Sequence, residues 1–244
     1  MISKMKTGIE GLDMMLYGGL PKGAQVILSG GPGTGKTLLS FEFLYRNAKA
    51  GNTSIFFALE EPPLEIVENA KSAFTDFTDI DTLIENKKLI IDGGELINKL
   101  SVGNTDSQNY EFGKIISEIE AMVAAEGANA IVIDSLSLLD MLIMDPLMFR
   151  RSSLALAANL KRLNVTSLLT MEMNTLERSK LEFRPEFFIY DGIIAMYQSG
   201  VEDKRVAAIE VIKMRGSNHS SATTPYEITP SGFRIFAAGG IDES

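Results

Sequence analysis

GGPGTGKT, residues 30–37, matches the pattern G-x-x-x-x-G-K-T, whose fixed positions fall on Gly30, Gly35, Lys36 and Thr37. Small residues let successive backbone N–H groups point inward and bind phosphate oxygens, and the start of a following helix adds a favourable dipole. In this pattern the lysine reaches the β- and γ-phosphates of a nucleotide, and the threonine hydroxyl binds Mg²⁺. The stretch therefore predicts a phosphate-binding loop, which requires a buried strand before it and a helix after it.

The segments on both sides of this loop alternate between strand-like and helix-like patterns. AQVILSG, residues 24–30, is a short apolar run that ends in glycine, as a buried strand does, and apolar residues recur at helical spacing over 37–51. Further strands are predicted over 53–59, 87–94, 129–137 and 165–173, and further helices over 64–74, 110–127 and 146–163. This alternation predicts an α/β fold with a mostly parallel sheet between layers of helices.

The pattern changes beyond Asn174. Strand-like runs separated by short polar turns follow over 187–197, 204–216 and 225–236, which predicts a C-terminal antiparallel extension of the sheet. Residues 95–109 have no clear period and predict a mobile loop. Because no repeat, low-complexity tract or linker divides the chain, we expect one domain over residues 1–244.

Composition limits the classes of partner. The chain has 23 basic and 32 acidic residues, so its net charge of −9 disfavours sequence-independent binding of nucleic acid or anionic lipid. It has no cysteine, which excludes disulfides and thiolate metal sites and is compatible with a reducing compartment. Since no apolar stretch approaches the roughly 20 residues of a membrane span, we expect a cytoplasmic protein that does not bind membranes.

Acidic residues follow two of the predicted strands. Asp134 ends the apolar run AIVID, where it would hold Mg²⁺ through a water and accept a hydrogen bond from Thr37. Glu60 and Glu61 come just after the strand over 53–59, at the sheet edge where ligands of open α/β sheets bind. Adjacent carboxylates can polarise a water that attacks a phosphate. The alternatives are a simple strand-end Asp and a solvated acidic helix start.

A second charged segment lies near the end of the chain. Lys213 and Arg215 are two residues apart on a predicted strand and so project from one face, followed by His219, the single histidine. Charges on an edge strand also discourage aggregation, which is the simplest interpretation of this pair. His219 either satisfies a hydrogen bond in a turn or contacts phosphate or ribose.

Several stretches of this sequence occur together in one known family. They are TGIEGLDMMLYGGLPKG (7–23), GGPGTGKT (30–37), EEPP (60–63), IVIDSLS (131–137), DGII (191–194) and KMRGSNH (213–219). With these stretches in this order, the chain resembles the KaiC-like ATPases of the RecA superfamily from about Thr7 to Phe236. Its length corresponds to one KaiC-type domain, whereas the circadian clock protein carries two in tandem. The resemblance implies a RecA-type P-loop NTPase core with ATP held between adjacent subunits of a ring, usually a hexamer.

The resemblance also implies roles for individual residues. The phosphate loop would bind ATP through Gly31, Gly33, Thr34, Gly35, Lys36, Thr37 and Leu38. Glu60 and Glu61 match the catalytic glutamate pair, with Glu60 favoured as the group that activates water. The expected metal-binding residues are Thr37, Glu60 and Asp134. Further nucleotide contacts would come from Ser72, Met214, Ser217, His219 and Thr229. Of these, the segment 213–219 would reach the site of the neighbouring subunit.

Two positions depart from the family pattern. The residue after Thr229 is Pro230, where the family often has Asp, which weakens the assignment of that end of the site. Phe187 and Phe188 stand where the phosphorylated Ser-Thr pair of the clock protein aligns. Without hydroxyl groups there, we expect no clock-type autokinase activity.

The cations of the last segment make chemical sense beside another subunit. The phosphate loop lacks an obvious second cation for the charge that builds up on the γ-phosphate. An arginine supplied by a neighbour is a known solution, because it stabilises this charge in the transition state. We therefore expect Lys213 and Arg215 to act catalytically in trans.

Three functions remain open from the sequence. The first is an ATPase ring that uses slow hydrolysis to regulate partner binding or assembly. The second is a recombinase-like protein that handles single-stranded DNA through the loop LERSKLEFRPEFF (176–188), in which Arg178, Lys180 and Arg184 alternate with glutamates. The third is a nucleotide-dependent scaffold that does not hydrolyse ATP. The glutamate pair and the metal set favour the first.

Overall fold

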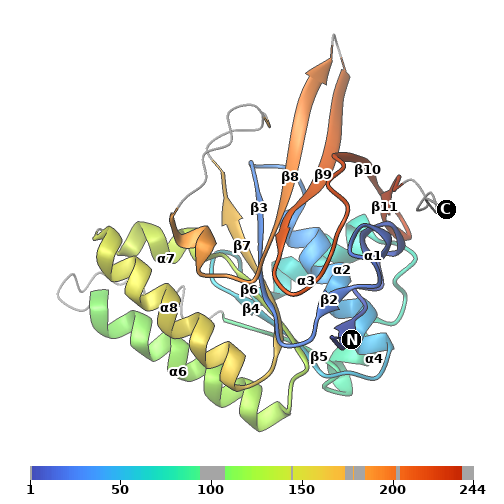
Figure 1. The fold of residues 1–244 in the computed structure, drawn as a ribbon. Coiled ribbons are helices and arrows are strands. Elements are labelled where there is room, and N and C mark those ends of the chain that lie inside the picture. Colours follow the sequence, from blue (N-terminus) through green and yellow to red (C-terminus); the bar gives the residue numbers. More distant parts are fainter. Residues whose placement is uncertain are drawn as a thin grey trace.

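The computed structural model describes residues 2–93, 108–143, 145–173, 178, 185–201 and 204–237. Its principal element is a nine-stranded sheet in the order β11-β10-β9-β8-β3-β7-β6-β4-β5 (Figure 1). These strands are β3 (Gln25–Gly30), β4 (Ser54–Ala58), β5 (Leu89–Asp92), β6 (Ala130–Asp134), β7 (Thr166–Glu172), β8 (Gly192–Val201), β9 (Lys204–Met214), β10 (Thr224–Thr229) and β11 (Gly232–Ile235). A separate two-stranded ribbon joins β1 (Lys4–Met5) and β2 (Leu20–Pro21).

The sheet is parallel from β8 through β5 and antiparallel from β8 to β11. This confirms the predicted α/β fold with a C-terminal antiparallel extension. One detail differs, because β8 is itself parallel to β3 and the antiparallel pairing begins only between β8 and β9. The central position of β3 places the loop that follows it in the middle of the sheet edge.

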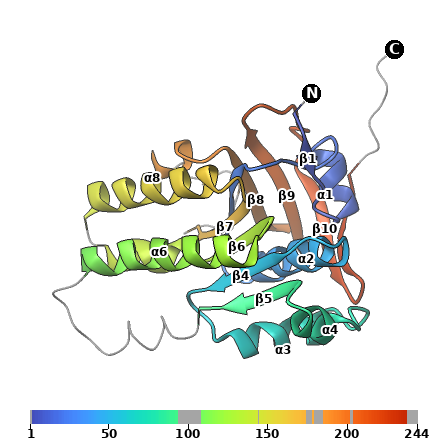
Figure 2. The ribbon, with the colours of Figure 1, turned by 90° about the horizontal axis from the view of Figure 1, so that it is seen from below.

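Helices cover both faces of the sheet. The elements are α1 (Glu10–Met15), α2 (Lys36–Lys49), α3 (Pro63–Ala73), α4 (Ile80–Glu85), α6 (Gln108–Glu126), α7 (Leu136–Leu142) and α8 (Pro146–Arg162). Figure 2 shows α6 and α8 side by side, apart from the group around α1 and α2. Alternating residues of β3 serve both layers, since Val26 and Leu28 pack into the core beside α1–α4 and Ile27 into the core beside α6–α8.

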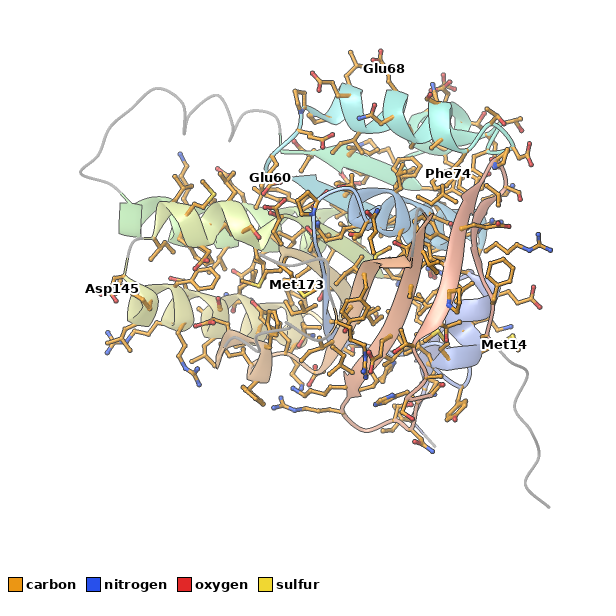
Figure 3. The ribbon with its side chains drawn as sticks, turned by 90° about the horizontal axis from the view of Figure 1, so that it is seen from above. Met14, Glu60, Glu68, Phe74, Asp145 and Met173 are labelled. Carbon is orange, nitrogen blue, oxygen red and sulfur yellow. The ribbon has the colours of Figure 1, made fainter. Side chains whose placement is uncertain are left out.

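The sequence of α3 shows how a surface helix is fixed to this core. Figure 3 shows Glu68 on the outer side of this helix and Phe74, its C-terminal cap, on the inner side. Phe74 is fully buried and packs against Phe77 with the two rings tilted and their centroids 4.7 Å apart, while Glu68 is exposed. The helix begins after Pro62, with Pro63 in its first turn, where a missing backbone N–H costs no hydrogen bond. The segment carrying Glu60 and Glu61 is therefore held between a strand end and a fixed helix start.

Some predicted strands begin, end or divide at other residues in the structure. The strand expected over 129–137 ends at Asp134, because the Ser135 hydroxyl caps a helix there by accepting a hydrogen bond from the Ser137 backbone N–H. The run 187–197 begins with a 3₁₀ turn (Pro185–Phe188) and becomes a strand only at Gly192. The run 225–236 folds into the β10–β11 hairpin, whose turn ends at Gly232 with φ +117°.

Two other expectations concern the loop over 95–109 and membrane-spanning helices. Of the loop expected over 95–109, residues up to 107 lie outside the described residues, and 108–109 belong to α6. No helix among the described residues is long and apolar enough to cross a membrane.

Candidate nucleotide-binding site

The phosphate loop joins β3 to α2 and contains glycines in backbone conformations that other residues rarely adopt. Gly33 and Gly35 have φ angles of +74° and +86°. A Cβ atom on Gly35 would also lie 3.1 Å from Ile228 and 3.1 Å from Phe233 of the β10–β11 hairpin. Glycine is therefore required at Gly35 both by the turn of the loop and by the hairpin that packs against it.

Lys36 closes the loop from within. Its Nζ donates hydrogen bonds to the carbonyl oxygens of Gly30 at 3.0 Å and Gly31 at 3.2 Å. Burial lowers the pKa of this ammonium group, while the carboxylates of Glu172, Asp134 and Glu60 act in the opposite direction. Both bonds go to neutral carbonyls, so the positive charge is available to an anion bound in the loop.

Thr37 and Asp134 form the hydrogen bond that the sequence predicted. The Thr37 hydroxyl donates a hydrogen bond of 2.7 Å to Oδ2 of Asp134 across the space between α2 and β6. The other carboxylate oxygen of Asp134 accepts from the hydroxyl of Thr170 on β7, which fixes the rotation of the carboxylate. The side chain of Asp134 is buried, so these bonds replace water that the carboxylate has lost.

Glu60 is held by a contact that the sequence did not indicate. Its Oε1 accepts a hydrogen bond from the hydroxyl of Ser135, the residue after Asp134. Partial burial raises the pKa of the Glu60 carboxyl, which the Ser135 hydrogen bond opposes and the neighbouring Asp134 reinforces. Glu61 points away to Asn69 of α3, with 3.4 Å between Nδ2 and Oε2. The two adjacent glutamates thus have different surroundings.

These groups line one pocket of about 270 Å³. Its walls are Pro32, Gly33, Gly35, Lys36, Thr37, Leu38, Glu60, Glu61, Asp134, Ser135 and Glu172. A larger hollow of about 470 Å³, lined in part by Lys4 and Arg46, contains none of the predicted site residues. We therefore take the smaller pocket as the site, because it holds the phosphate loop and the predicted catalytic carboxylates.

The pocket is compatible with magnesium that is held together with a nucleotide. No group of three or more His, Cys, Asp or Glu side chains in the described part of the chain forms a ready-made metal cage. Mg²⁺ in phosphate-transfer sites typically takes one or two protein oxygens and completes its shell with waters and substrate phosphates. The Thr37 hydroxyl and the Asp134 carboxylate are oxygen donors of this kind, side by side next to the loop.

Glu172 is a site residue that sequence analysis missed. It ends β7 directly beside Gly30 in the parallel register and faces the phosphate pocket. The signal was present, since Glu172 is an acidic residue at the end of an apolar strand, as Asp134 is. What the sequence lacked was the strand order, which alone makes β7 the neighbour of β3.

Two further contacts reach the loop from the C-terminal strands. The Tyr226 hydroxyl of β10 donates to the carbonyl oxygen of Thr34 at 2.5 Å, and Nε2 of Gln198 on β8 donates to that of Gly33 at 2.9 Å. Thr34 itself donates from its hydroxyl to Gly31 at 2.8 Å. The loop is thus held from outside by side chains that lie more than 160 residues away in sequence.

Lys213 and Arg215 lie at the opposite end of the strands from this pocket. Lys213 is paired with Ile193 near the start of β8, whereas the phosphate loop leaves β3 beside Met196. β9 ends at Met214, so Arg215 follows the strand instead of belonging to it. Both cations nevertheless bind the same turn, since Lys213 donates to Tyr190 O at 2.6 Å and Arg215 to Phe188 O at 2.7 Å.

The remaining predicted contacts do not line the pocket within this chain. Ser72 is exposed on α3, and Met214 is buried at the end of β9. Ser217 and His219 lie in the turn that follows, where Nδ1 of His219 is 3.0 Å from Ser220 O. Thr229 bonds within its own hairpin turn, to Gly232 O at 2.7 Å.

The loop considered for DNA binding is described only at Arg178 and over 185–188, so Lys180 and Arg184 lie outside the described residues. The guanidinium of Arg178 forms two hydrogen bonds to the carboxylate of Glu210 on β9, at 2.6 and 2.8 Å. This pairing compensates the charge of the one basic residue of the loop for which a position is described. The described residues thus provide no observation that favours DNA binding.

Comparison with known proteins gives consistent matches. Residues 5–240 match the family model described as "ATPase: KaiC". The chain is 32% identical to the circadian clock oscillator protein KaiC of Picosynechococcus sp. over 98% of its own length, and it spans 46% of that protein. It is also 32% identical to a UPF0273 protein of Aeropyrum pernix, with 97% of this chain and 94% of that protein aligned.

A similar solved structure is that of a KaiC-like protein from the hyperthermophilic archaeon Pyrococcus horikoshii. The two share 27% sequence identity and superpose with a TM-score of 0.80, covering 97% of this chain and all of the other. The chain therefore spans about half the length of the clock proteins it matches, and nearly the whole of its single-domain archaeal relatives.

Proposed function

Because this chain belongs to the KaiC ATPase family, we propose that it binds and slowly hydrolyses ATP between adjacent copies of itself in a ring. One observation carries the proposal. Lys36, the Thr37–Asp134 pair and Glu60 line the same pocket beside the phosphate loop. These are the groups that phosphate binding, metal binding and water activation require. Hydrolysis would then regulate partner binding or assembly of the ring.

Each side chain has a distinct role in this proposal. The backbone N–H groups of the loop and Lys36 bind the β- and γ-phosphates. Thr37 and Asp134 would hold Mg²⁺, and Glu60 lines the same pocket. When bound, Mg²⁺ reduces the negative charge of the phosphates. Glu60 accepts a proton from the attacking water, and Glu61 assists from the rim.

The location of the cations supports a site shared between subunits. Lys36 is the only Lys, Arg or His among the described residues that line the pocket. Lys213 and Arg215 lie at the other end of the strands, where they bind the backbone oxygens of Tyr190 and Phe188. In a ring, that end of one subunit can face the phosphate pocket of the next. The neighbour's ATP would then contact Lys213, Arg215, Met214, Ser217 and His219, while Ser72 and Thr229 contact it from the binding subunit.

Mixed assemblies test this arrangement. Arg215→Ala chains lack the donated cation and Lys36→Ala chains lack the phosphate-binding lysine, so each alone should lose ATP turnover. In a mixture, interfaces form in which an intact phosphate loop meets an intact Arg215. We expect turnover to rise well above the sum of the two separate variants. A mixture with no more activity than its components would contradict the shared site.

The ring size and the location in the cell are proposed on the same basis. The resemblance to KaiC-like proteins implies six subunits, which light scattering of the nucleotide-bound protein measures directly. A single domain over 1–244 is supported by the sheet that runs from β3 to β11. The absence of cysteine supports a reducing compartment, for which we propose the cytoplasm.

The alternative function is a passive scaffold, and measurements of ATP turnover test it. If the chain only senses nucleotide, ATP would bind and remain intact, and the Glu60→Gln/Glu61→Gln double variant would behave as the unaltered protein does. We expect instead a measurable turnover in the unaltered chain that is abolished in the double variant while ATP binding persists.

A further inference from the structure

The two cations at the end of β9 are held by a single short segment of the same chain. Residues 187–190, named here the carbonyl turn, direct their backbone oxygens toward Lys213 and Arg215. Lys213 Nζ lies 2.6 Å from Tyr190 O and 3.5 Å from Phe187 O, and the Arg215 guanidinium lies 2.7 Å from Phe188 O and 3.4 Å from Ile189 O. Backbone carbonyls are neutral, so they fix the two cations without cancelling the charge that a neighbour's phosphates would meet.

Asp191 follows the carbonyl turn, and its carboxylate faces the Arg215 guanidinium. Oδ1 of Asp191 lies 4.0 Å from Nη1 of Arg215 and 3.3 Å from Nζ of Lys161 on α8. The Asp191 side chain is 12% exposed and that of Arg215 is 51% exposed. The carboxylate is therefore fixed inside the fold, while the guanidinium it faces remains accessible to another molecule.

The backbone of Asp191 adds a second connection. Its carbonyl oxygen accepts a hydrogen bond of 2.8 Å from the Arg215 N–H, and its own N–H donates one of 2.8 Å to Gln25 O. Oδ2 of Asp191 in turn accepts from the Gln25 N–H at 3.3 Å. Gln25 begins β3, so Asp191 joins the segment that carries the cations to the first residue of the central strand.

We propose that Asp191 is a positioning residue for the cations that act in trans, with Arg215 as its direct partner. This inference rests on the proposed function, because it assumes that Lys213 and Arg215 serve the neighbouring subunit. Asp191 faces the guanidinium through one distant ion pair and fixes the Arg215 backbone through one short hydrogen bond. It also anchors the carbonyl turn, whose backbone oxygens hold both side chains. Misplacement of a catalytic cation by about 1 Å can cost roughly 100-fold in rate.

The position of Asp191 makes the inference specific to one side of the shared site. It precedes Gly192, which is paired with Val26 at the start of β3, whereas the chain's own phosphate loop begins at Gly30 at the other end of that strand. Asp191 thus cannot touch the nucleotide of its own chain. A defect at Asp191 should be felt only in the pocket of the subunit that receives Arg215.

Asp191→Asn is the variant to test, because asparagine keeps the shape and can still accept the bond from the Gln25 N–H. We expect the turnover number to fall between about 10- and 100-fold. Binding of a fluorescent ATP analogue to the phosphate loop, and the assembly state, should stay within twofold of the unaltered protein. Lys161→Met is the matched control, since it removes the other cation on the same carboxylate and should leave turnover unchanged.

Mixing variants distinguishes positioning from a general structural role. Asp191→Asn mixed with Lys36→Ala should regain turnover, because some interfaces combine an intact donor edge with an intact phosphate loop. Asp191→Asn mixed with Arg215→Ala should not regain it, because both defects lie on the donor side of every interface.

Each other outcome overturns a stated part. Rescue of Asp191→Asn by Arg215→Ala, or normal turnover of Asp191→Asn alone, would overturn the positioning role while leaving the shared site intact. Failure of Arg215→Ala and Lys36→Ala to complement each other would overturn the shared site and this role with it.

Discussion

The hydroxyl of Thr37 donates a hydrogen bond of 2.7 Å to the carboxylate of Asp134, a residue 97 positions away in sequence. The bond connects the first turn of α2 with the end of β6. It places two oxygen donors next to each other beside the phosphate loop. Several expectations about the site depend on this pair and on the carboxylates around it.

Replacing Asp134 by Asn should separate metal binding from nucleotide binding. Asparagine can still accept the bond from Thr37, but it removes the negative charge that faces the metal. We expect Mg²⁺-dependent ATP turnover to fall by about 10- to 100-fold, the usual cost of altering an outer partner of a metal. Binding of ATP in EDTA should be unchanged or tighter, because a negative charge near the phosphates is gone. Equal turnover of variant and unaltered protein at saturating Mg²⁺ would contradict the metal role of Asp134.

The two glutamates after β4 should differ in their effect on turnover. Glu60 accepts a hydrogen bond from Ser135, which follows Asp134, whereas Glu61 accepts one from Asn69 within α3. We expect Glu60→Gln to lower the turnover number by about 10²–10⁴-fold, the range for loss of a general base. Glu61→Gln serves as the matched variant and should cost far less. The assignment of Glu60 as the base would be wrong if Glu61→Gln had the larger effect while both variants bound ATP equally.

The turn of the β10–β11 hairpin should not tolerate a side chain at Gly232. This residue has φ +117°, and a Cβ atom there would lie 2.1 Å from Oε1 of the buried Glu42. We expect Gly232→Ala to lower the free energy of unfolding by about 2–4 kcal/mol, since backbone strain and a steric clash add up. Chemical denaturation of both proteins measures this difference.

Gly51→Ala provides the comparison for backbone strain alone. Gly51 also has a positive φ, +91°, but a Cβ atom there would meet nothing within 4 Å. We expect a loss of only about 1 kcal/mol for this variant. If both alanine variants lost the same free energy of unfolding, the clash of the added Cβ atom with Glu42 would not contribute to the loss at Gly232.

Glu210 should make the stability of the fold depend on pH in the acid range. The hydrogen bonds from Arg178 hold the pKa of the Glu210 carboxyl below its ordinary value of 4.5. A carboxyl with a lowered pKa in the folded state stabilises the protein above its unfolded pKa, and this contribution is lost as the pH falls through the folded pKa. We therefore expect Glu210→Gln to lower the melting temperature at pH 7, and the difference from the unaltered protein to shrink below about pH 4.

A surface ion pair serves as the control for this effect. Glu227 lies 3.4 Å from Arg234 with both side chains largely exposed, so Glu227→Gln should leave the melting temperature almost unchanged at either pH. A constant difference between Glu210→Gln and the unaltered protein from pH 7 to pH 3 would show that the ionisation of Glu210 does not contribute.

Much of this fold could be predicted from local pattern. The β3–loop–α2 unit and the strand ending at Glu172 are short apolar runs bounded by helices, and their bounds in the structure lie within one or two residues of the prediction. The errors occurred where a side chain ends an apolar run early. Ser135 caps α7 inside a stretch that looked like a continuing strand, and the backbone bonds of Asp191 mark the end of the turn before β8.

The composition of the site was less accessible than its motifs. Glu60, Asp134 and Lys36 belong to recognisable patterns, and the structure brings them together in one pocket. Glu172 ends an apolar strand as Asp134 does, but Ser135 and Gln198 belong to no such pattern. Glu172 and Gln198 approach the loop because β7 and β8 are the two neighbours of β3, and strand order depends on packing between distant segments. Ser135 lies at the pocket because it follows Asp134 at the end of β6.

The sequence by itself determined which side chains are available to the site: a glycine-rich loop that ends in a lysine and a threonine, acidic residues at strand ends, and two cations near the end of a late strand. These follow from residue types at fixed spacing, because backbone geometry makes near neighbours in sequence near neighbours in space. The tertiary structure alone decided at which end of the strands each group lies. Lys213 and Arg215 lie at the end opposite to the phosphate loop, since β9 runs antiparallel to β8 and ends where β8 begins.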